Sequence, residues 1–178
     1  MLLIKQGKIS DDLWVAVADG EPVPADRPAI VSLQRWQAET AALRARVAPL
    51  GIRLANSDSV ADIAVGLDRF DLVTLNFPKF TDGRAYSQAR LLRERHGFTG
   101  EIRATGQVLR DQFLLMHRVG FDAFEVSDPR AADAWLEALQ EIRVRYQEAA
   151  DGGVTVRDLR RRAAQSLMWA QAEVTAAW

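Results

Sequence analysis

Apolar runs and helical patterns alternate along most of the chain. The runs AIVSL, IRLAN, DLVTLNF, EIRAT and DAFEV end at Leu33, Asn56, Phe77, Thr105 and Val126. After most of these runs, apolar residues recur at spacings of three and four, which indicates a helix with one buried face. Five strand–helix units with short connections predict an α/β fold: a doubly wound, mainly parallel five-stranded sheet covered by helices on both faces.

The same spacing predicts the apolar faces of individual helices. One helix is expected to carry Trp36, Thr40, Leu43 and Val47, and the next clear one Ala85, Ala89 and Leu92. The later two are expected to carry Val108, Leu109, Phe113 and Met116, and then Trp135, Leu139, Ile142 and Tyr146. Such faces pack against the sheet in α/β folds.

Both ends of the chain extend beyond this pattern. Residues 1–27 hold two short apolar runs, Met1–Ile4 and Leu13–Ala18, which predict a small hairpin or two edge strands before a proline-rich connection. Residues 28–150 form the α/β domain, and residues 154–178 follow a glycine pair as an amphipathic helix. Thr155 and Asp158 fit a capping box at its start. Its apolar stripe is expected either to pack on its own domain or to contact a partner, for example in a homodimer.

Composition narrows the classes of function. A net charge of −1 over 178 residues argues against bulk binding of nucleic acid or of a membrane surface, which usually needs an excess of Lys and Arg. The chain has no cysteine and two histidines, neither in a metal-binding spacing, so no metal site is expected. No run approaches the roughly 20 apolar residues that span a bilayer. A cytoplasmic protein is expected.

The loop after Asn76 carries the strongest candidate chemistry. In parallel sheets ligands bind at the carboxyl ends of strands, near helix N-termini. Lys79 and Arg84 follow this strand end, and Arg103 and Arg110 flank the next one. If the two strands are neighbours, the four cations are expected to converge on a planar sulfo, phospho or carboxyl group. The candidate anion- or partner-binding residues are Asn76, Lys79, Asp82, Arg84, Tyr86, Arg103, Thr105, Arg110 and Asp111.

A purely structural role stays open for these cations. Arg84 is then expected to pair with Asp82 or Glu101, and Arg110 with carboxylates near Asp111 on a solvated helix face. Exposed pairs of this kind contribute only about 0 to 1 kcal/mol. Phe77 and Phe80 are expected to anchor the loop in the core.

The stretch from Asp71 to Pro129 resembles a response-regulator receiver domain. Asn76 stands where a receiver carries its phosphorylated aspartate, Thr105 matches the switch hydroxyl, and Ser127 replaces the lysine. An amide cannot form an acyl phosphate, so the resemblance implies only the flavodoxin- or receiver-like fold.

A longer stretch, from about Pro28 to Tyr146, resembles the bacterial family catalogued as domain of unknown function 934. The resemblance rests on LNFPKFTDGRAYSQARLLRER, GEIRATGQVLRDQ and GFDAFE. Members are typically encoded beside sulfite reductase and phosphoadenylyl-sulfate reductase, and are often labelled as oxidoreductases without a demonstrated reaction. The resemblance therefore implies a role in assimilatory sulfate reduction, with either enzyme as a partner.

Three hypotheses for function follow. The leading one is an accessory protein of sulfite reduction that binds a sulfur oxyanion, or docks on the reductase, through the basic rim at the strand ends. The second is an oxidoreductase with a bound flavin or nicotinamide, although no GxGxxG follows a strand. The third is an interaction module that assembles through the C-terminal helix. The sequence identifies no catalytic residue and no cofactor.

Overall fold

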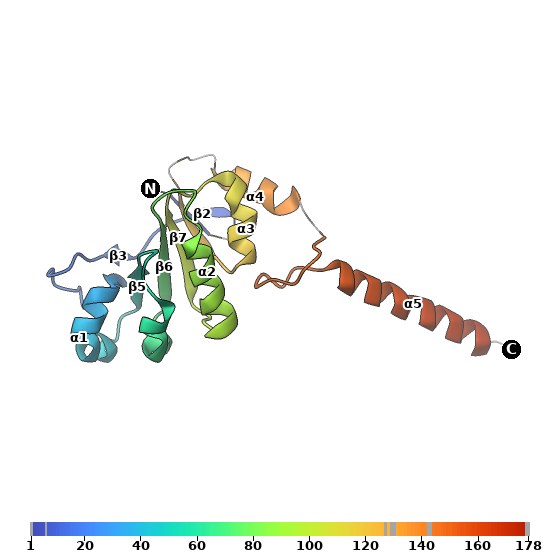
Figure 1. Cartoon of the computed structure of the whole chain (residues 1–178), viewed down its shortest axis with the longest axis horizontal. Helices are drawn as coiled ribbons and strands as arrows, with labels where there is room; N and C mark the ends of the chain where they lie inside the picture. Colours follow the sequence, from blue (N-terminus) through green and yellow to red (C-terminus); the bar gives the residue numbers. More distant parts are fainter. Residues whose placement is uncertain (1, 6, 127, 129–130, 142–143, 177–178) are drawn as a thin grey trace.

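The protein is an α/β sheet structure with one helix that projects from it (Figure 1). The computed structural model describes residues 2–5, 7–126, 128, 131–141 and 144–176. The strands are β1 (Leu2–Lys5), β2 (Lys8–Ser10), β3 (Val15–Ala16), β4 (Ala29–Ser32), β5 (Leu50–Leu54), β6 (Leu72–Phe77), β7 (Glu101–Gly106) and β8 (Ala123–Val126). The helices are α1 (Leu33–Ala45), η1 (Val60–Arg69), α2 (Arg84–Arg90), η2 (Leu91–Arg95), η3 (Arg110–Gln112), α3 (Phe113–Arg118), α4 (Ala131–Glu141) and α5 (Val156–Ala176).

The strands form one mixed sheet in the order β2-β1-β8-β7-β6-β5-β4-β3. The five predicted strands are β4 to β8, and they pair in parallel in the order in which they occur in the chain. The α/β class is therefore confirmed. The described sheet has eight strands and not five, because β3 adds a parallel strand at one edge and β1 and β2 add antiparallel strands at the other.

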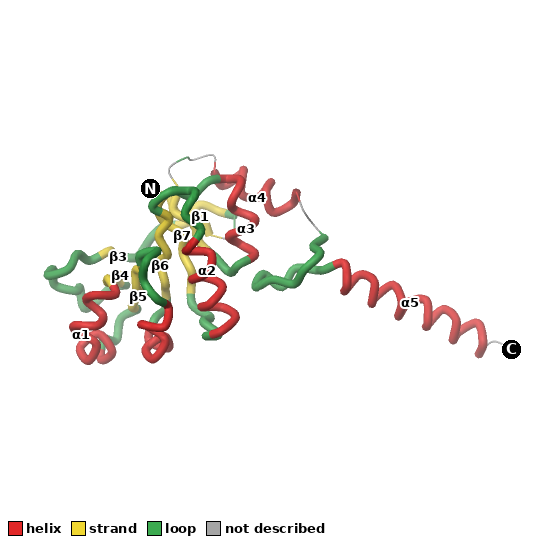
Figure 2. Tube along the Cα trace, in the orientation of Figure 1, coloured by secondary structure: helices red, strands yellow, loops and turns green. Residues whose placement is uncertain are grey.

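The prediction of a doubly wound sheet is wrong. In a doubly wound sheet the strand order reverses, and right-handed crossovers then place helices on both faces. Here the order from β4 to β8 never reverses, so successive right-handed crossovers leave their helices on one face. The core agrees with this arrangement, because Trp36 of α1, Ile63 of η1, Ala85 of α2 and Phe113 of α3 all belong to one buried cluster. Figure 2 shows the strands beside these helices.

The alternation of side chains along each strand separates the two faces of the sheet. On β7, Ile102 and Ala104 lie in the core beneath the helices. Glu101, Arg103 and Thr105 therefore point to the opposite, helix-free face. This face begins at Ser32 on β4 and continues across the parallel strands.

The sheet is curled toward its helix-free face. Residues 11–14, here called the strap, are the whole connection between β2 at one edge and β3 at the other. Ser10 and Val15 can lie at most about 18 Å apart along so short a segment. A flat sheet of eight strands would separate its edges by about 34 Å. The strap therefore crosses the helix-free face and draws the two edges together.

Several predicted side-chain positions agree with the structure. Trp36 and Leu43 are buried, as are Ala85, Ala89 and Leu92 of the α2–η2 helix and Phe113 and Met116 of α3. Val47 is wholly exposed because α1 ends at Ala45, and Leu109 and Tyr146 are also exposed. The side chains of Trp135 and Leu139, and the residues Ser127 and Ile142, lie outside what the structure describes.

The predicted N-terminal hairpin is present, but its second strand is not the predicted one. β1 does form a hairpin, but its partner is Lys8–Ser10, and Gly7 supplies the turn with a φ of 74°. Val15–Ala16 instead forms the opposite edge of the sheet. The polar segments KQG and SDD precede β2 and β3, but such segments do not specify which strand an edge strand pairs with.

The predicted C-terminal helix is present as α5, and its capping box is confirmed. The amide of Asp158 donates to Thr155 Oγ1 at 3.2 Å, and the amide of Thr155 donates to Asp158 Oδ2 at 3.2 Å. The helix extends away from the sheet rather than packing on its own domain (Figure 1). Leu159 is consequently 41% exposed.

Candidate functional site

The predicted site begins where β6 ends, in residues 78–84, here called the rim loop. Phe77 is fully buried and packs edge-on against the ring of Tyr86, 5.2 Å between centroids, so its predicted anchoring role is confirmed. Phe80 was expected to be an anchor as well, but it is 51% exposed. The rim loop therefore presents a large aromatic ring at the carboxyl edge of the sheet.

Hydrogen bonds from the neighbouring loop hold Phe80 in place. Its amide donates to Gln107 Oε1 at 3.1 Å, and its carbonyl accepts from Gln112 Nε2 at 2.9 Å. β6 and β7 are neighbours, as predicted, with Asn76 opposite Thr105. Gly106 closes β7 with a φ of 89°, and a Cβ there would lie 2.4 Å from the Phe77 carbonyl oxygen. The two loops thus form one interlocked rim in which Phe80 is exposed but fixed.

Asp82 and Arg84 form an ion pair on the rim loop. Arg84 Nη2 and Nε lie 2.7 and 3.0 Å from the two oxygens of Asp82, and Asn56 Nδ2 also donates to Asp82. Hydrogen bonding from Arg84 lowers the pKa of Asp82 to about 2. Asp82 also accepts from the amide of Arg84 at 3.3 Å, next to the N-cap residue of α2, which is Gly83. The pairing matches the structural alternative for Arg84.

The other basic candidates also have carboxylate partners, except Lys79. Arg110 lies 2.7 Å from Glu141 and 3.6 Å from Glu137, both on α4. Burial and the charge of Asp111 raise the pKa of Tyr86 to about 12. Lys79 is exposed and has no ion pair with a described residue.

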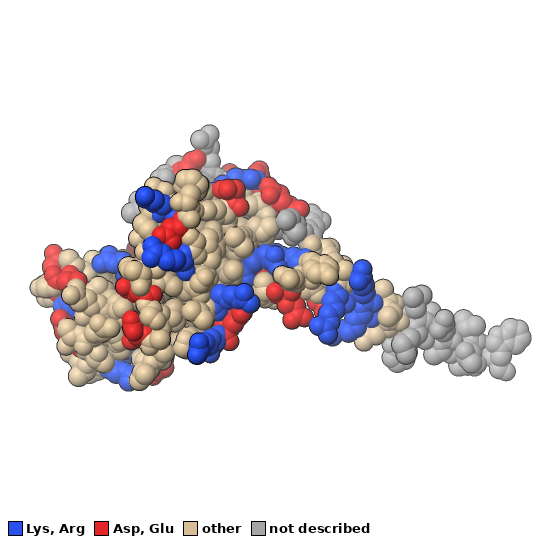
Figure 3. All heavy atoms as spheres, in the orientation of Figure 1, with Lys and Arg blue, Asp and Glu red and all other residues tan. Residues whose placement is uncertain are grey.

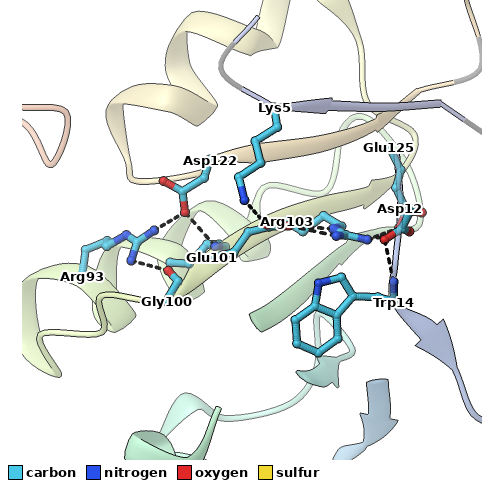
Figure 4. Close-up of polar contacts among 10 residues, drawn as sticks. Lys5, Asp12, Trp14, Arg93, Gly100, Glu101, Arg103, Asp122 and Glu125 are labelled. Atoms are coloured by element: carbon cyan, nitrogen blue, oxygen red, sulfur yellow. Dashed lines mark hydrogen bonds and ion pairs between the residues drawn. The ribbon is translucent and has the colours of Figure 1, made fainter. Parts of the chain in front are cut away.

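Arg103 lies beneath the strap, in a buried ionic network (Figure 4). Its side chain is 1% exposed, and its guanidinium lies 2.8 Å from Asp12, 2.9 Å from Glu101 and 3.6 Å from Glu125. Lys5, on the antiparallel strand β1, lies 2.7 Å from Glu101. Burial raises the pKa of Glu125, while the charge of Arg103 opposes that shift. The network joins β7, β8 and the strap.

The strap also makes an apolar contact on the helix-free face. Asp12 Oδ1 accepts from the amide of Trp14, which fixes the turn of the strap. The Trp14 ring lies over Gly51 on β5, where an added Cβ would come within 3.2 Å of the ring. Arg103 and Gly51 therefore dock the strap at two separate points.

The structure does not bring the four predicted cations together on one anion. Arg84, Arg103 and Arg110 each pair with different carboxylates, and Arg103 lies under the strap. The expectation that β6 and β7 are neighbours is confirmed, but no pattern in the sequence indicated the partners of Arg103. Whether the exposed rim residues bind an anion or a partner stays a prediction.

A pocket of about 500 Å³ opens at the carboxyl ends of β4, β5 and β6. Its polar lining consists of Ser32, Gln34, Gln37, Arg53, Asp58 and Asn76. Ser32 caps α1 by accepting from the amide of Arg35 at 3.0 Å, and it donates to Asp19 at 2.6 Å. Asp58 Oδ2 accepts a hydrogen bond from the amide of Ala55. Arg53 is exposed, and its side chain has no hydrogen bond or ion pair with a described residue.

Arg53 is a functional candidate that the sequence reasoning missed. It interrupts the apolar run of β5, and its register opposite Thr74 places it on the helix-free face. A charged residue in a buried strand was the available signal. The exposure of Phe80 had no such signal, because an aromatic residue in a loop that follows a buried strand is equally compatible with a buried loop anchor.

The described residues contain no helix long and apolar enough to cross a membrane. The same residues contain no group of three or more His, Asp or Glu side chains arranged to hold a metal ion.

Comparison with known protein families identifies the family of this chain. The sequence model of a family described as "Bacterial protein of unknown function (DUF934)" matches residues 51–156. The match includes the rim loop, Arg53 and Arg103, and it ends at the first residue of α5. No curated protein matches the chain.

Proposed function

This chain belongs to the bacterial family of unknown function DUF934, and we propose that it is an accessory protein of assimilatory sulfite reduction that docks on the sulfite reductase through the rim loop. The observation that carries the proposal is Phe80, whose side chain is half-exposed while its backbone amide and carbonyl are both hydrogen-bonded to the neighbouring loop. The reductase as partner is inferred from the sequence resemblance. A cytoplasmic location is part of the same proposal.

An exposed aromatic side chain on a hydrogen-bonded backbone is well suited to protein recognition. Aromatic residues are enriched at the energetic centres of interfaces, and a loop whose backbone is already ordered loses less entropy on binding. Lys79 beside it and the Asp82–Arg84 pair supply the polar rim typical of an interface. The rim loop therefore has an anchor and a polar border.

The proposal is tested by the affinity of the purified protein for the sulfite reductase of the same bacterium. Phe80→Ala is expected to weaken binding roughly 30-fold or more, the loss typical of an interface anchor. Leu91→Ala is the matched control, since Leu91 is 40% exposed on a different surface. Both variants should keep the stability of the parent protein. Absence of a complex, or equal affinity of the two variants, contradicts the proposal.

Arg53 favours a second candidate function, the binding of a small oxyanion in the β4–β6 pocket. The first turn of α1 leaves the amides of Leu33 and Gln34 without helical partners at the same place. An unpaired guanidinium beside such amides is a favourable environment for sulfite, sulfate or phosphate. Asp19 and Asp58 also lie near, but each carboxylate already accepts a hydrogen bond.

Calorimetry with sulfite, sulfate and phosphate distinguishes this candidate from docking. Arg53→Gln is expected to reduce anion affinity roughly tenfold or more, as the loss of a charge-assisted hydrogen bond implies. Arg95→Gln removes another exposed guanidinium outside the pocket and should change nothing. If none of the three anions binds the parent protein, or if the two variants bind equally, the pocket is not an oxyanion site.

A further inference from the structure

The C-terminal helix α5 carries a dense basic surface at its base. Arg157, Arg160, Arg161 and Arg162 lie within its first two turns and are exposed (Figure 3). Arg161 contacts Asp158 at 3.3 Å, with its side chain 69% exposed. The side chains of the other three form no hydrogen bond or ion pair with a described residue. With Asp158 included, this segment carries a net charge of +3.

Of these four arginines, only Arg161 pairs with a described carboxylate of its own helix, that of Asp158. The N-terminal end of a helix carries partial positive charge, so Arg157 in the first turn is electrostatically unfavourable. Carboxylates outside α5 would stabilise Arg157, Arg160 and Arg162. Leu159, 41% exposed among them, adds apolar surface to the same segment.

The surface of α4 has the complementary character. Asp133, Glu137 and Glu141 follow one another at four-residue spacing and are exposed, the side chains of Glu137 and Glu141 by 71% and 56%. Arg110 neutralises only part of this charge. Leu136, 43% exposed, lies on the same helix. Arg157 and Arg161 repeat at the same spacing, so a second helix can match these carboxylates in register. Figure 3 shows acidic side chains over α4 and basic ones at the base of α5.

The joint before α5, residues 144–155, makes buried contacts of its own. The side chain of Asp151 is 1% exposed and pairs with Arg145 at 2.7 Å. Arg145 also forms a β-bridge with Thr155, the residue that caps α5 and is itself buried.

Contacts with α3 fix this joint to the body of the protein. Arg118 donates to the carbonyl of Gln147, and the amide of Ala150 donates to the carbonyl of Arg118, both at 3.0 Å. The direction in which α5 leaves the sheet is therefore set by an ordered and partly buried segment.

We propose that α5 is an exchanged arm, which docks on α4 of a second copy of this chain while the arm of that copy docks on α4 of the first. The juxtaposition of a basic arm directed away from its own α4 with an acidic α4 surface makes the second copy the fitting occupant. The arm is about 31 Å long, and reciprocal exchange doubles the buried contact. The interface shares no residue with the rim loop or the β4–β6 pocket.

The mass in solution, measured by light scattering after size exclusion, tests the inference. The full chain is expected at twice 19.8 kDa, and the chain ending at Gly153 at the mass of one truncated copy. An Arg160→Glu/Arg161→Glu variant and an Asp133→Arg/Glu137→Arg variant are each expected to be monomeric. Arg27→Glu/Arg95→Glu, with the same change of charge elsewhere on the surface, is expected to remain dimeric. Far-UV circular dichroism checks that every variant is folded.

Mixing the two monomeric variants is the decisive step. The acidic arm of the first variant then faces the basic α4 of the second, and the basic arm of the second faces the acidic α4 of the first. A heterodimer is expected, and raising the salt from about 0.05 to 0.5 M should weaken it, because the Debye length shortens severalfold. A monomeric parent protein, a dimer that survives truncation, or failure of the two folded variants to associate overturns the proposal.

Discussion

Replacement of Arg103 by Met tests whether the buried ionic network holds the strap on the helix-free face. The substitution keeps much of the side-chain length but leaves Asp12, Glu101 and Glu125 without the guanidinium that all three approach within 3.6 Å. Removal of one partner from a buried ion pair typically costs about 3 to 5 kcal/mol, since the remaining charges stay desolvated. Because Lys5 continues to pair with Glu101, the free energy of unfolding is expected to fall by about 3 kcal/mol.

Such a loss is large compared with the whole stability of a domain, about 5 to 15 kcal/mol. Urea unfolding followed by tryptophan fluorescence should show a lower midpoint with an unchanged slope. For a chain of this length the melting temperature is expected to fall by roughly 6 to 12 °C. Arg90→Met is the control, because Arg90 pairs with Glu94 on an exposed helix face, where the loss should be below about 1 kcal/mol.

The pH dependence of Arg103→Met gives a second readout. Without the guanidinium, the folded-state pKa of Glu125 should rise further, since burial already raises it and Arg103 alone opposes that shift among the larger causes. A raised carboxyl pKa destabilises the fold above the unfolded pKa, and the penalty disappears as pH falls through the raised folded value. The stability gap to the parent protein should therefore narrow in acid. Equal stability of Arg103→Met and Arg90→Met at neutral pH would refute the role assigned to the network.

Three further outcomes are expected. Gly106→Ala should lower the free energy of unfolding in urea by about 3 kcal/mol or more, because the φ of Gly106 is 89° and the added Cβ would meet the Phe77 carbonyl. Gly97→Ala is the control and should cost about 1 to 2 kcal/mol, since Gly97 has a φ of 62° but open space around it. Similar losses for the two variants would contradict the interlocked rim. Folding lowers the pKa of Asp82 from 3.8 to about 2, so its contribution to stability should be full above about pH 4 to 5 and should be lost as pH falls toward 2. The difference in unfolding free energy between the parent protein and Asp82→Asn should therefore close over that interval. A titration of the Asp82 carboxyl near pH 3.8, measured by NMR, would show that Arg84 does not lower its pKa. Freshly purified protein should be colourless and should not bind added flavin mononucleotide, since the strand order offers no switch-point crevice for it; a visible flavin spectrum would revive the oxidoreductase hypothesis.

The sequence carried the α/β class and the five parallel strands because their apolar runs and helical spacings are local signals. Strand order is not local, so a doubly wound sheet and a consecutively ordered one produce the same pattern up to β8. The edge strands depend on pairings such as Leu3 with Glu125, which no periodicity records. Capping of α5 by Thr155 and Asp158 was predictable, since both residues lie within one turn.

The candidate site was less predictable than the fold. Asn76 and Thr105 were placed correctly side by side, because sequential parallel strands are usually neighbours. The partner of Arg103 is Asp12, 91 residues away in the chain, and it reaches β7 only because the sheet is curled. The pairing of Arg84 with Asp82 was within reach of the sequence, as the two residues are two positions apart.

Hydrogen exchange on the protein mixed with its sulfite reductase tests docking through the rim loop most directly. Amides of residues 79–84 and of the adjoining loop at Gln107 should exchange more slowly in the complex than in the free protein, and Phe80→Ala should abolish that protection. Protection confined to α5, or no change at the rim loop despite a stable complex, would contradict the proposed docking surface.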